Sequence, residues 1–386
     1  VFTKKNVSFI SFGKVRASYG SSGNDGIGDY AYLERYQAIE GIDRYQGTMG
    51  LRTRGVFNPY YGWESTKKFE VALDLGFFKD RILITNSYFR NRSGNQLIDY
   101  PYPNTAGPGQ VIVNFPALIQ NSGYEFTINS KNIDQKLLSW ATSLNISFDR
   151  NKLVSFPEID NTSYKYTNTV GEPFAGIVNT YRFSRVNPQT GKYEFILRSG
   201  ENAEDPSELS QLDNGAYVRT NTNPSFYGGM GNIIKYRNLS LDFFVQFTKQ
   251  LGINPLNINL FNAGNNVNLP VEYLRRWQKA GDVTDIQMLF ARFNTEGPGF
   301  RDAAGWRSNS DVAYVDASFI RLKNVSFSYQ APTSWQQTLK LSNLTFFVQA
   351  QNIFTLTSYK GFDPETQYLY ALPPLRTVTA GIKLGL

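Results

Sequence analysis

The stretch that decides the fold is LLSWATSLNISFD, residues 137–149. Apolar and polar side chains alternate along it with the period of two at which strand side chains change face. One face receives Leu138, Trp140, Leu144, Ile146 and Phe148. The opposite face receives Ser139, Ser143, Asn145, Ser147 and Asp149. The pattern predicts a strand of an antiparallel sheet that has one apolar and one polar face.

The same alternation recurs in segments far apart in the chain. Residues 239–250 place Leu241, Phe243, Val245 and Phe247 opposite Asp242 and Gln246. Residues 68–78 place a row of apolar side chains opposite Glu70 and Asp74. The final residues carry Val378, Ile382, Leu384 and Leu386 on one face. The chain is therefore predicted to be all-β.

The connections between these strands alternate in length. Lys79-Asp80 and Arg237-Asn238 are two-residue turns, and KNIDQK at 131–136 is a third short connection. The long connections are rich in Gly, Pro and Asn and span 21–62, 99–116, 151–225, 251–311 and 356–373. Short periplasmic turns at one end and long extracellular loops at the other are typical of outer-membrane barrels. The predicted strands are 8–20, 63–78, 81–98, 117–130, 137–150, 226–236, 239–250, 312–330, 341–355 and 374–386.

Composition narrows the possible functions. The 386 residues include no Cys and no His, which excludes thiol nucleophiles, His-containing triads and the commonest metal ligands. We therefore predict no enzyme activity, no catalytic residue, no cofactor and no metal site. The net charge of +7 comes from basic residues scattered at turns and strand ends, so nucleic-acid binding is not predicted. No run approaches the ~20 apolar residues of a membrane helix, and VFTKKNVSFISFG at the start lacks the zones of a signal peptide.

Longer motifs resemble one family. GKVRASYGSSGNDGIGDYAYLERY (13–36), WESTKKFEVALDLGFFKDRI (63–82), SYFRNRSGNQLIDYPYP (87–103) and FPALIQNSGYEFTINS (115–130) resemble segments of the SusC/RagA family of TonB-dependent outer-membrane transporters. DASFIRLKNVSFSYQAP (316–332), FFVQAQNIFTLTSYKGFDPE (346–365) and LPPLRTVTAGIKLGL (372–386) resemble the C-terminal end of that family. Outer-membrane barrels commonly finish on an aromatic residue, and this chain departs from that pattern by ending at Leu386.

The resemblance implies a fold and a location. It implies that residues 1–386 form the C-terminal half of the barrel domain, about ten antiparallel strands of a transmembrane barrel of about 22, without the plug domain and the first strands. The location implied is the outer membrane of a Gram-negative bacterium, and the role is uptake of glycans or peptides. The partners implied are a SusD-like surface lipoprotein, the TonB–ExbB–ExbD motor acting through the missing N-terminal region, outer-membrane lipid and the barrel assembly machinery.

Each face then acquires an expected role. The lipid-facing belt is expected to be Leu138, Trp140, Leu144, Ile146, Leu241, Phe243, Val245 and Phe247. The lumen-facing candidates are Glu70, Asp74, Ser143, Asn145, Asp242, Gln246, Gln349 and Gln351. The expected C-terminal insertion signal is Val378, Ile382, Leu384 and Leu386.

Three segments invite other interpretations. GSSGNDGIGD (20–29) has no helical period after it and fails the Ca²⁺-loop spacing, so turn chemistry is expected. The acidic residues Glu201, Glu204, Asp205 and Glu208 are expected to be ordinary loop residues and not a glycosidase pair. VEYLRRWQKAGDVTD (271–285) is expected to be the one helical stretch, packing a loop through Val271, Leu274 and Trp277.

Two alternatives remain open. The fold could serve as a structural subunit of an outer-membrane secretion or assembly machine. Alternation alone also fits a soluble β-sandwich adhesin or lectin, in which the apolar face is buried against a second sheet.

Overall fold

The fold comes from a computed structural model that describes residues 9–24, 30, 32–39, 46–55, 57–58, 60–101, 110–206, 218–259, 268–290, 297–367 and 372–386. Among these residues, no helix has the length and hydrophobicity needed to span a membrane.

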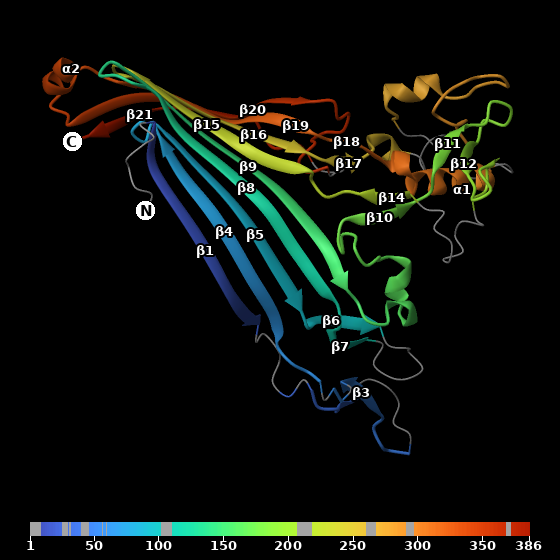
Figure 1. The fold of residues 1–386 in the computed structure, drawn as a ribbon. Coiled ribbons are helices and arrows are strands. Elements are labelled where there is room, and N and C mark those ends of the chain that lie inside the picture. Colours follow the sequence, from blue (N-terminus) through green and yellow to red (C-terminus); the bar gives the residue numbers. More distant parts are fainter. Residues whose placement is uncertain are drawn as a thin grey trace.

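One antiparallel sheet of ten strands dominates the described structure (Figure 1). Its strands, in spatial order, are β1 (Ile10–Asn24), β4 (Glu64–Phe77), β5 (Ile82–Gly94), β8 (Leu118–Asp134), β9 (Leu138–Ser155), β15 (Phe226–Tyr236), β16 (Leu239–Lys249), β19 (Phe319–Gln330), β20 (Asn343–Thr357) and β21 (Thr377–Gly385). Spatial order follows chain order throughout, so every pair is a simple up-and-down neighbour. β1 and β21 lie at the two edges and are not paired with each other in the described residues.

The predicted strands correspond closely to these ten, with differences at their ends. The segment 81–98 divides at Asn95, after which β6 (Gln96–Pro101) pairs with β7 (Gln110–Phe115) outside the main sheet. The segment 312–330 divides into a 3₁₀ turn, the short strand β18 (Tyr314–Asp316) and β19. In both segments the hydrophobic pattern continues beyond the point where the strand changes its pairing partner. The pattern does not show where that change occurs.

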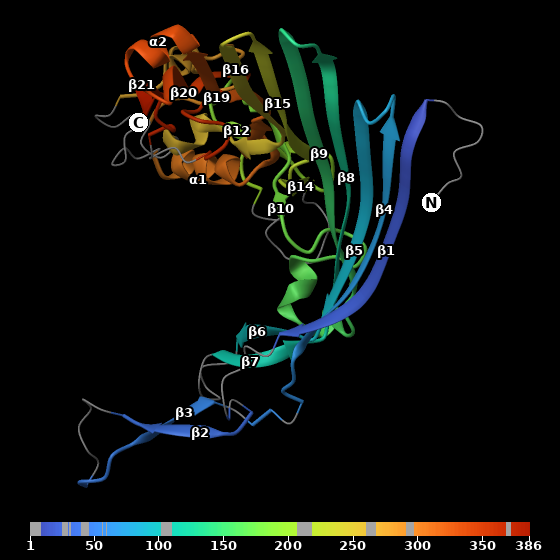
Figure 2. The same cartoon turned by 90° about the vertical axis from the view of Figure 1, so that its left-hand side faces the viewer.

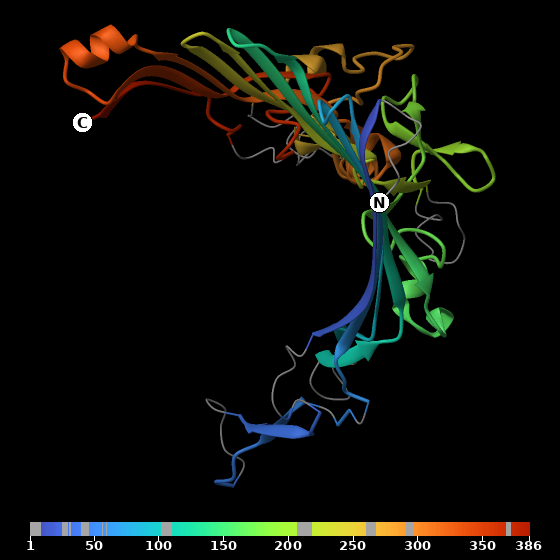
Figure 3. The ribbon, with the colours of Figure 1, turned by 60° about the vertical axis from the view of Figure 1, so that its left-hand side comes forward.

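Short turns and long loops separate to opposite ends of the sheet, as the connection lengths predicted. In Figure 2 the β4–β5 and β8–β9 turns lie at one end, and β6, β7, β2 (Arg35–Ala38) and β3 (Leu51–Gly55) extend from the other. Phe78, Lys79 and Asp80 adopt positive φ in the β4–β5 turn, as does Arg237 in the β15–β16 turn. These left-handed residues let the chain reverse within a few positions. Figures 2 and 3 show that the whole sheet curves strongly across its width.

The register assigns each side chain to a face. One cross-strand row joins Ile146, Gly228, Phe247, Ile320 and Leu356 on the face that we call the apolar face. The adjacent row joins Asn145, Gly229, Gln246, Arg321 and Thr355 on the opposite face, the polar face. The apolar face leaves many large side chains exposed, among them Val15, Tyr19, Phe327, Val348, Phe354, Leu356, Val378 and Ile382. A soluble sandwich would require a second sheet packed over this face. In the described residues no second sheet packs there.

The loop end carries most of the remaining elements. They are β10 (Ile177–Thr180), β11 (Phe183–Val186), β12 (Tyr193–Ile196), β13 (Asn202–Ala203), β14 (Val218–Asn221), β17 (Leu251–Ile253) and the helix α1 (Gly297–Ser308). The most buried cluster of the described residues is here and contains Val186, Tyr193, Phe195, Trp277, Phe290, Phe300, Ala303 and Ala304. The loops therefore carry their own small core.

The expectation of a single helix over 271–285 is wrong. Only Val271–Arg275 is helical, as the 3₁₀ turn η6, whereas α1 and α2 (Thr333–Thr338) are α-helices elsewhere. Val271 and Leu274 are largely exposed, and the buried side chains are Tyr273 and Trp277. Trp277 donates its indole N–H to the carbonyl of Pro188 at 2.9 Å, so a tertiary contact rather than a helical stripe holds this segment.

The turn chemistry expected over 20–29 also needs correction. β1 runs to Asn24, so Gly20–Asn24 are strand residues paired with β4. The rest of that motif, 25–29, lies outside the described residues.

Candidate functional site: the polar face of the sheet

All eight candidates for lumen contact lie on the polar face. Asp74 and Glu70 stand on β4, Ser143 and Asn145 on β9, Asp242 and Gln246 on β16, and Gln349 and Gln351 on β20. The eight belt residues and the four C-terminal residues project to the apolar face or continue its alternation. The register thus separates the two sets, although it does not bring the eight polar residues into one site.

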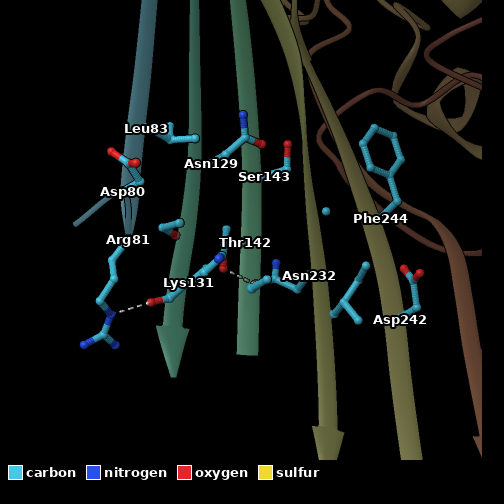
Figure 4. A pocket seen from close by; sticks show the side chains of 14 residues that line it. Asp80, Arg81, Leu83, Asn129, Lys131, Thr142, Ser143, Asn232, Asp242 and Phe244 are labelled. Atoms are coloured by element: carbon cyan, nitrogen blue, oxygen red, sulfur yellow. Dashed lines mark hydrogen bonds between the residues drawn. The ribbon is translucent and has the colours of Figure 1, made fainter. Parts of the chain in front are cut away.

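Two of these residues share a cavity. Ser143 and Asp242 line a depression of about 350 Å³ near the turn end, together with Leu83, Asn129, Ile233 and Phe244 (Figure 4). The depression crosses strands from β5 to β16 and is lined on its turn side by Asp80, Arg81 and Lys131. Its lining combines hydroxyl, amide and carboxylate groups with apolar surface. Such a lining suits a ligand that has both polar and apolar groups.

Phe244 is an aromatic residue on the polar face. The alternation did not identify it. It sits between Asp242 and Gln246 on β16, and its partner on β15 is Gly231. Its ring covers Gly229, where an added Cβ would lie 2.3 Å from the ring, so only glycine fits there. The glycine lets an aromatic ring lie flat on the sheet.

A buried ion-pair cluster lies farther toward the loop end. Arg321 on β19 donates from Nη1 to Glu365 Oε2 at 2.6 Å and from Nη2 to Asp363 Oδ2. Lys323 Nζ lies 3.1 Å from Glu365 Oε2, and Gln246 Nε2 donates to Glu365 Oε1 at 3.1 Å. The side chain of Arg321 is only 2% exposed, and its charge and that of Lys323 are matched by the two carboxylates.

The cluster fixes the segment 358–367 against the sheet. Gln250 Nε2 donates to the carbonyl of Pro364 at 2.7 Å, and the hydroxyl of Tyr359 donates to the carbonyl of Ile253 at 2.8 Å. Asp363 Oδ1 also accepts the backbone N–H groups of Glu365 and Thr366 at 3.0 Å. We call this segment the 358–367 strap.

Sequence reasoning missed the charged members of this cluster. Arg321 and Lys323 belong to the motif DASFIRLKNVSFSYQAP, and Asp363 and Glu365 to FFVQAQNIFTLTSYKGFDPE, but nothing in either motif says that they meet. The available signal was the presence of two cations, Arg321 and Lys323, on a strand that contains no carboxylate. A charge there requires a partner once it is buried.

Another polar-face pair lies near the first edge. The guanidinium of Arg16 donates to both carboxylate oxygens of Asp74, at 2.9 and 3.2 Å, and Thr85 donates to the same carboxylate at 2.9 Å. Asp74 is thus engaged within the sheet. Glu70 lies two steps along the same face of β4, opposite Ser18 and Phe89.

The apolar face also contains a small group of hydrogen-bonded polar atoms close to the turns. Trp140 donates its indole N–H to Asn232 Oδ1 at 2.9 Å, and Thr142 donates to the same oxygen at 2.7 Å. On the loop side of the same face, Tyr88 and Tyr124 are cross-strand partners with ring centroids 4.9 Å apart. Aromatic residues that pair a polar tip with apolar surroundings are typical of membrane interfaces.

Among the acidic loop residues that the structure describes, Glu204 has several local partners. Glu204 accepts hydrogen bonds from Asn187 and Thr190 and lies 3.5 Å from Lys192, so its charge is used locally. Glu208 lies outside the described residues. Among the residues that the structure describes, no group of three or more carboxylates is placed to hold a metal ion.

The open antiparallel sheet is similar in fold to part of a solved outer-membrane importer. Its fold matches the RagAB peptide importer in its open-open state with a TM-score of 0.77 at 22% identity, covering 99% of this chain and 41% of that one. The closed-closed state of the same importer gives a TM-score of 0.77 as well.

Sequence comparison agrees with the fold. The chain is 28% identical over 384 residues to the TonB-dependent receptor P3 of Formosa agariphila, covering 94% of this chain and 37% of that receptor. It is 25% identical over 388 residues to the TonB-dependent receptor SusC of Bacteroides thetaiotaomicron, covering 94% of this chain and 36% of SusC. No protein-family model matches the chain. The predicted resemblance to the SusC/RagA transporters is confirmed, and the chain spans little more than a third of the curated relatives it matches.

Proposed function

We propose that the chain is the C-terminal half of the barrel domain of a SusC-like, TonB-dependent importer in the outer membrane of a Gram-negative bacterium. In this proposal, strands outside the chain complete the barrel by pairing with β1 and β21. An open strand edge in hydrocarbon costs several kcal/mol for each unpaired backbone group, so a ten-stranded sheet in lipid needs such partners.

The observation that carries the proposal is the uncovered apolar face opposite a charged polar face. On β9 this apolar face is bounded by Trp140 near the turns and by Phe148, the partner of Tyr124, toward the loops. The eight steps from Trp140 to Phe148, at about 3.3 Å each, span ~26 Å along the strand, or ~20 Å after a tilt of about 40°. That height is close to the ~25 Å apolar band of outer-membrane barrels.

The polar face is proposed to line the lumen. The eight candidates for lumen contact, with Phe244 and the Arg321 cluster, would then form part of the wall past which cargo moves. Hydrogen-bonding and charged groups with isolated aromatic surface suit polar oligomers such as glycans or peptides better than apolar solutes.

The proposed partners follow from the SusC likeness. A SusD-like surface lipoprotein would contact the long loops, and TonB–ExbB–ExbD would supply energy through parts of the transporter outside this chain. Outer-membrane lipid and the barrel assembly machinery would meet the apolar face, including Val378, Ile382, Leu384 and Leu386. We propose no enzymatic role, because the homologues are receptors and transporters.

The test uses the full-length transporter in its native host. We expect a chromosomal deletion to abolish growth on one class of oligomeric nutrient, glycan or peptide. Plasmid-borne full-length protein should restore growth only in a strain with intact TonB. The tagged protein should fractionate with the outer membrane, migrate heat-modifiably and co-purify with a surface lipoprotein.

Unchanged growth of the deletion strain on every glycan and peptide source, combined with stable co-purification of secretion or assembly components, would contradict import. Release of the protein from membranes by salt alone would contradict the barrel.

A further inference from the structure

The turn end of the sheet carries most of the net charge of the chain. The four short connections of the described sheet, taken together with the strand residues next to them, are 78–81, 131–137, 235–239 and 330–342, and we call them the turn rim. They contain seven cations, Lys79, Arg81, Lys131, Lys136, Lys235, Arg237 and Lys340, against two carboxylates, Asp80 and Asp134. The rest of the chain holds 32 cations and 30 carboxylates and is nearly balanced. The rim therefore accounts for five of the seven net positive charges.

The cations are available to a partner. All seven side chains are exposed. Arg81, Lys131 and Lys235 stand on the side of the polar face, whereas Lys79, Lys136, Arg237 and Lys340 lie in the turns themselves. Asp80 is engaged by Ser11, whose hydroxyl donates to it at 2.5 Å. Seven cations outnumber the two carboxylates, so the rim keeps a net positive charge.

The turns form one continuous band rather than separate fingers. The guanidinium of Arg81 donates to the carbonyls of Lys131 and Asn132, at 3.3 and 2.8 Å. The N–H of Arg237 donates to the carbonyl of Leu137 at 2.9 Å, and Asn238 donates through its side chain to the carbonyl of Gln330 at 2.8 Å. Each turn is tied to the next, so the cations are held along a single edge.

Aromatic side chains accompany the cations on the same edge. Phe78, Tyr236 and Trp335 are exposed there, and Trp140 is exposed just above on the apolar face. Trp335 belongs to α2, which lies at the turn end in Figures 1 and 2. Arg237 packs its guanidinium over the ring of Tyr236, with 5.5 Å between its Cζ atom and the ring centroid. Aromatic rings at the acyl boundary with cations just beyond them match the layers of a lipid leaflet.

We propose that the turn rim is a binding surface for anionic glycerophospholipid head groups of the periplasmic leaflet. The inference rests on the proposed membrane location and goes beyond it, because a barrel needs lipid but not lipid of a particular charge. The basic band would attract phosphate-bearing head groups, since cations near an anionic lipid surface each add to the attraction. The rings would hold the barrel at a fixed depth in the same leaflet.

The test is lipid selectivity of the full-length transporter, purified in detergent and reconstituted into nanodiscs of phosphatidylcholine with about a quarter phosphatidylglycerol. Lipids that remain bound after mild re-extraction are counted by native mass spectrometry. The rim variant carries Lys79→Gln, Lys136→Gln and Arg237→Gln, which remove three exposed cations from the turns themselves. The matched control carries Lys279→Gln, Arg301→Gln and Lys360→Gln, which remove three exposed cations from the loop end.

The wild type and the control are expected to retain phosphatidylglycerol in excess over its share of the nanodisc. In the rim variant this excess should be at least about fivefold smaller. The excess should also fall at high salt, because the head groups are held by charge. Equal retention by the rim variant, or an equal loss in the control, overturns the proposal. Binding of an acidic periplasmic protein instead of lipid also overturns it. Heat-modifiable migration of all three proteins tests barrel formation separately, so its failure would count against the proposed function and not against the lipid surface.

Discussion

The guanidinium of Arg321 donates to the carboxylate of Asp363, 42 residues farther along the chain, and both side chains are almost fully buried. This pair joins a sheet strand to the 358–367 strap. A buried charge is costly without its partner. The strap is therefore expected to keep its position only while Arg321 and Asp363 remain paired.

Asp363→Ala should release the 358–367 strap. It removes one of two carboxylates from a buried cation and also the acceptor for two backbone N–H groups, so we expect a local destabilisation of about 3 kcal/mol. Hydrogen exchange of 358–367 and tryptic cleavage at Lys360 should both accelerate. Asp285→Asn, which breaks the exposed Arg275–Asp285 pair, is the control and should leave the strap unchanged. The double variant Arg321→Met/Asp363→Leu should recover much of the protection, and unprotected exchange in it would mean that packing, not charge, holds the strap.

Leu144→Arg and Ser143→Arg should differ although they are neighbours. Leu144 lies six positions from the start of β9 on the apolar face, near the proposed bilayer midplane, where an arginine costs ~2–4 kcal/mol. Ser143 lies on the polar face and borders the cavity of Figure 4. Heat-modifiable barrel in outer-membrane fractions should fall for Leu144→Arg only. Equal loss for both variants would remove the assignment of one face to lipid.

Gly229→Val should impair the sheet through one ring. The new Cβ would lie 2.3 Å from Phe244, and relief of such a clash typically costs about 1–3 kcal/mol. Thermal unfolding in detergent measures the loss, and Phe244→Ala in the same chain should restore most of it. Gly231→Ala is the matched control, since its added Cβ would meet the same ring at 3.8 Å. A failure of Phe244→Ala to rescue would place the strain elsewhere.

The contact between β17 and β18 should weaken in acid. Lys249 donates to the carboxylate of Asp316 at 2.8 Å, and this hydrogen bond is the main reason that the pKa of Asp316 falls from 3.8 to about 2. A carboxyl whose pKa is lower in the folded state stabilises that state above the unfolded pKa and loses its effect as the pH falls through the folded pKa. Protection of 251–253 and 314–316 from hydrogen exchange, corrected for intrinsic rates, should therefore decline between about pH 4 and pH 2. Asp316→Asn should lower the protection at neutral pH and flatten this decline, whereas Asp160→Asn should do neither. An unchanged pH profile in Asp316→Asn would assign the decline to another group.

Much of the main sheet could be predicted because its information is local. A period of two in 137–149 and 239–250 defines strand and face at once, and short polar turns define which strands are neighbours. The loop end could not be predicted in the same way. There the structure depends on contacts between distant segments, such as Trp277 with Pro188, and the helical reading of 271–285 failed for that reason.

The sequence by itself determined the alternation, the ten extended segments, the separation of short from long connections and the likeness to SusC-type transporters. Tertiary structure alone decided that Arg321 meets Asp363 and Glu365, that Phe244 lies over Gly229, and that seven scattered cations form one edge. The physical reason is that alternation is a property of neighbours along the chain, whereas burial of a charge and continuity of a rim depend on the register between strands.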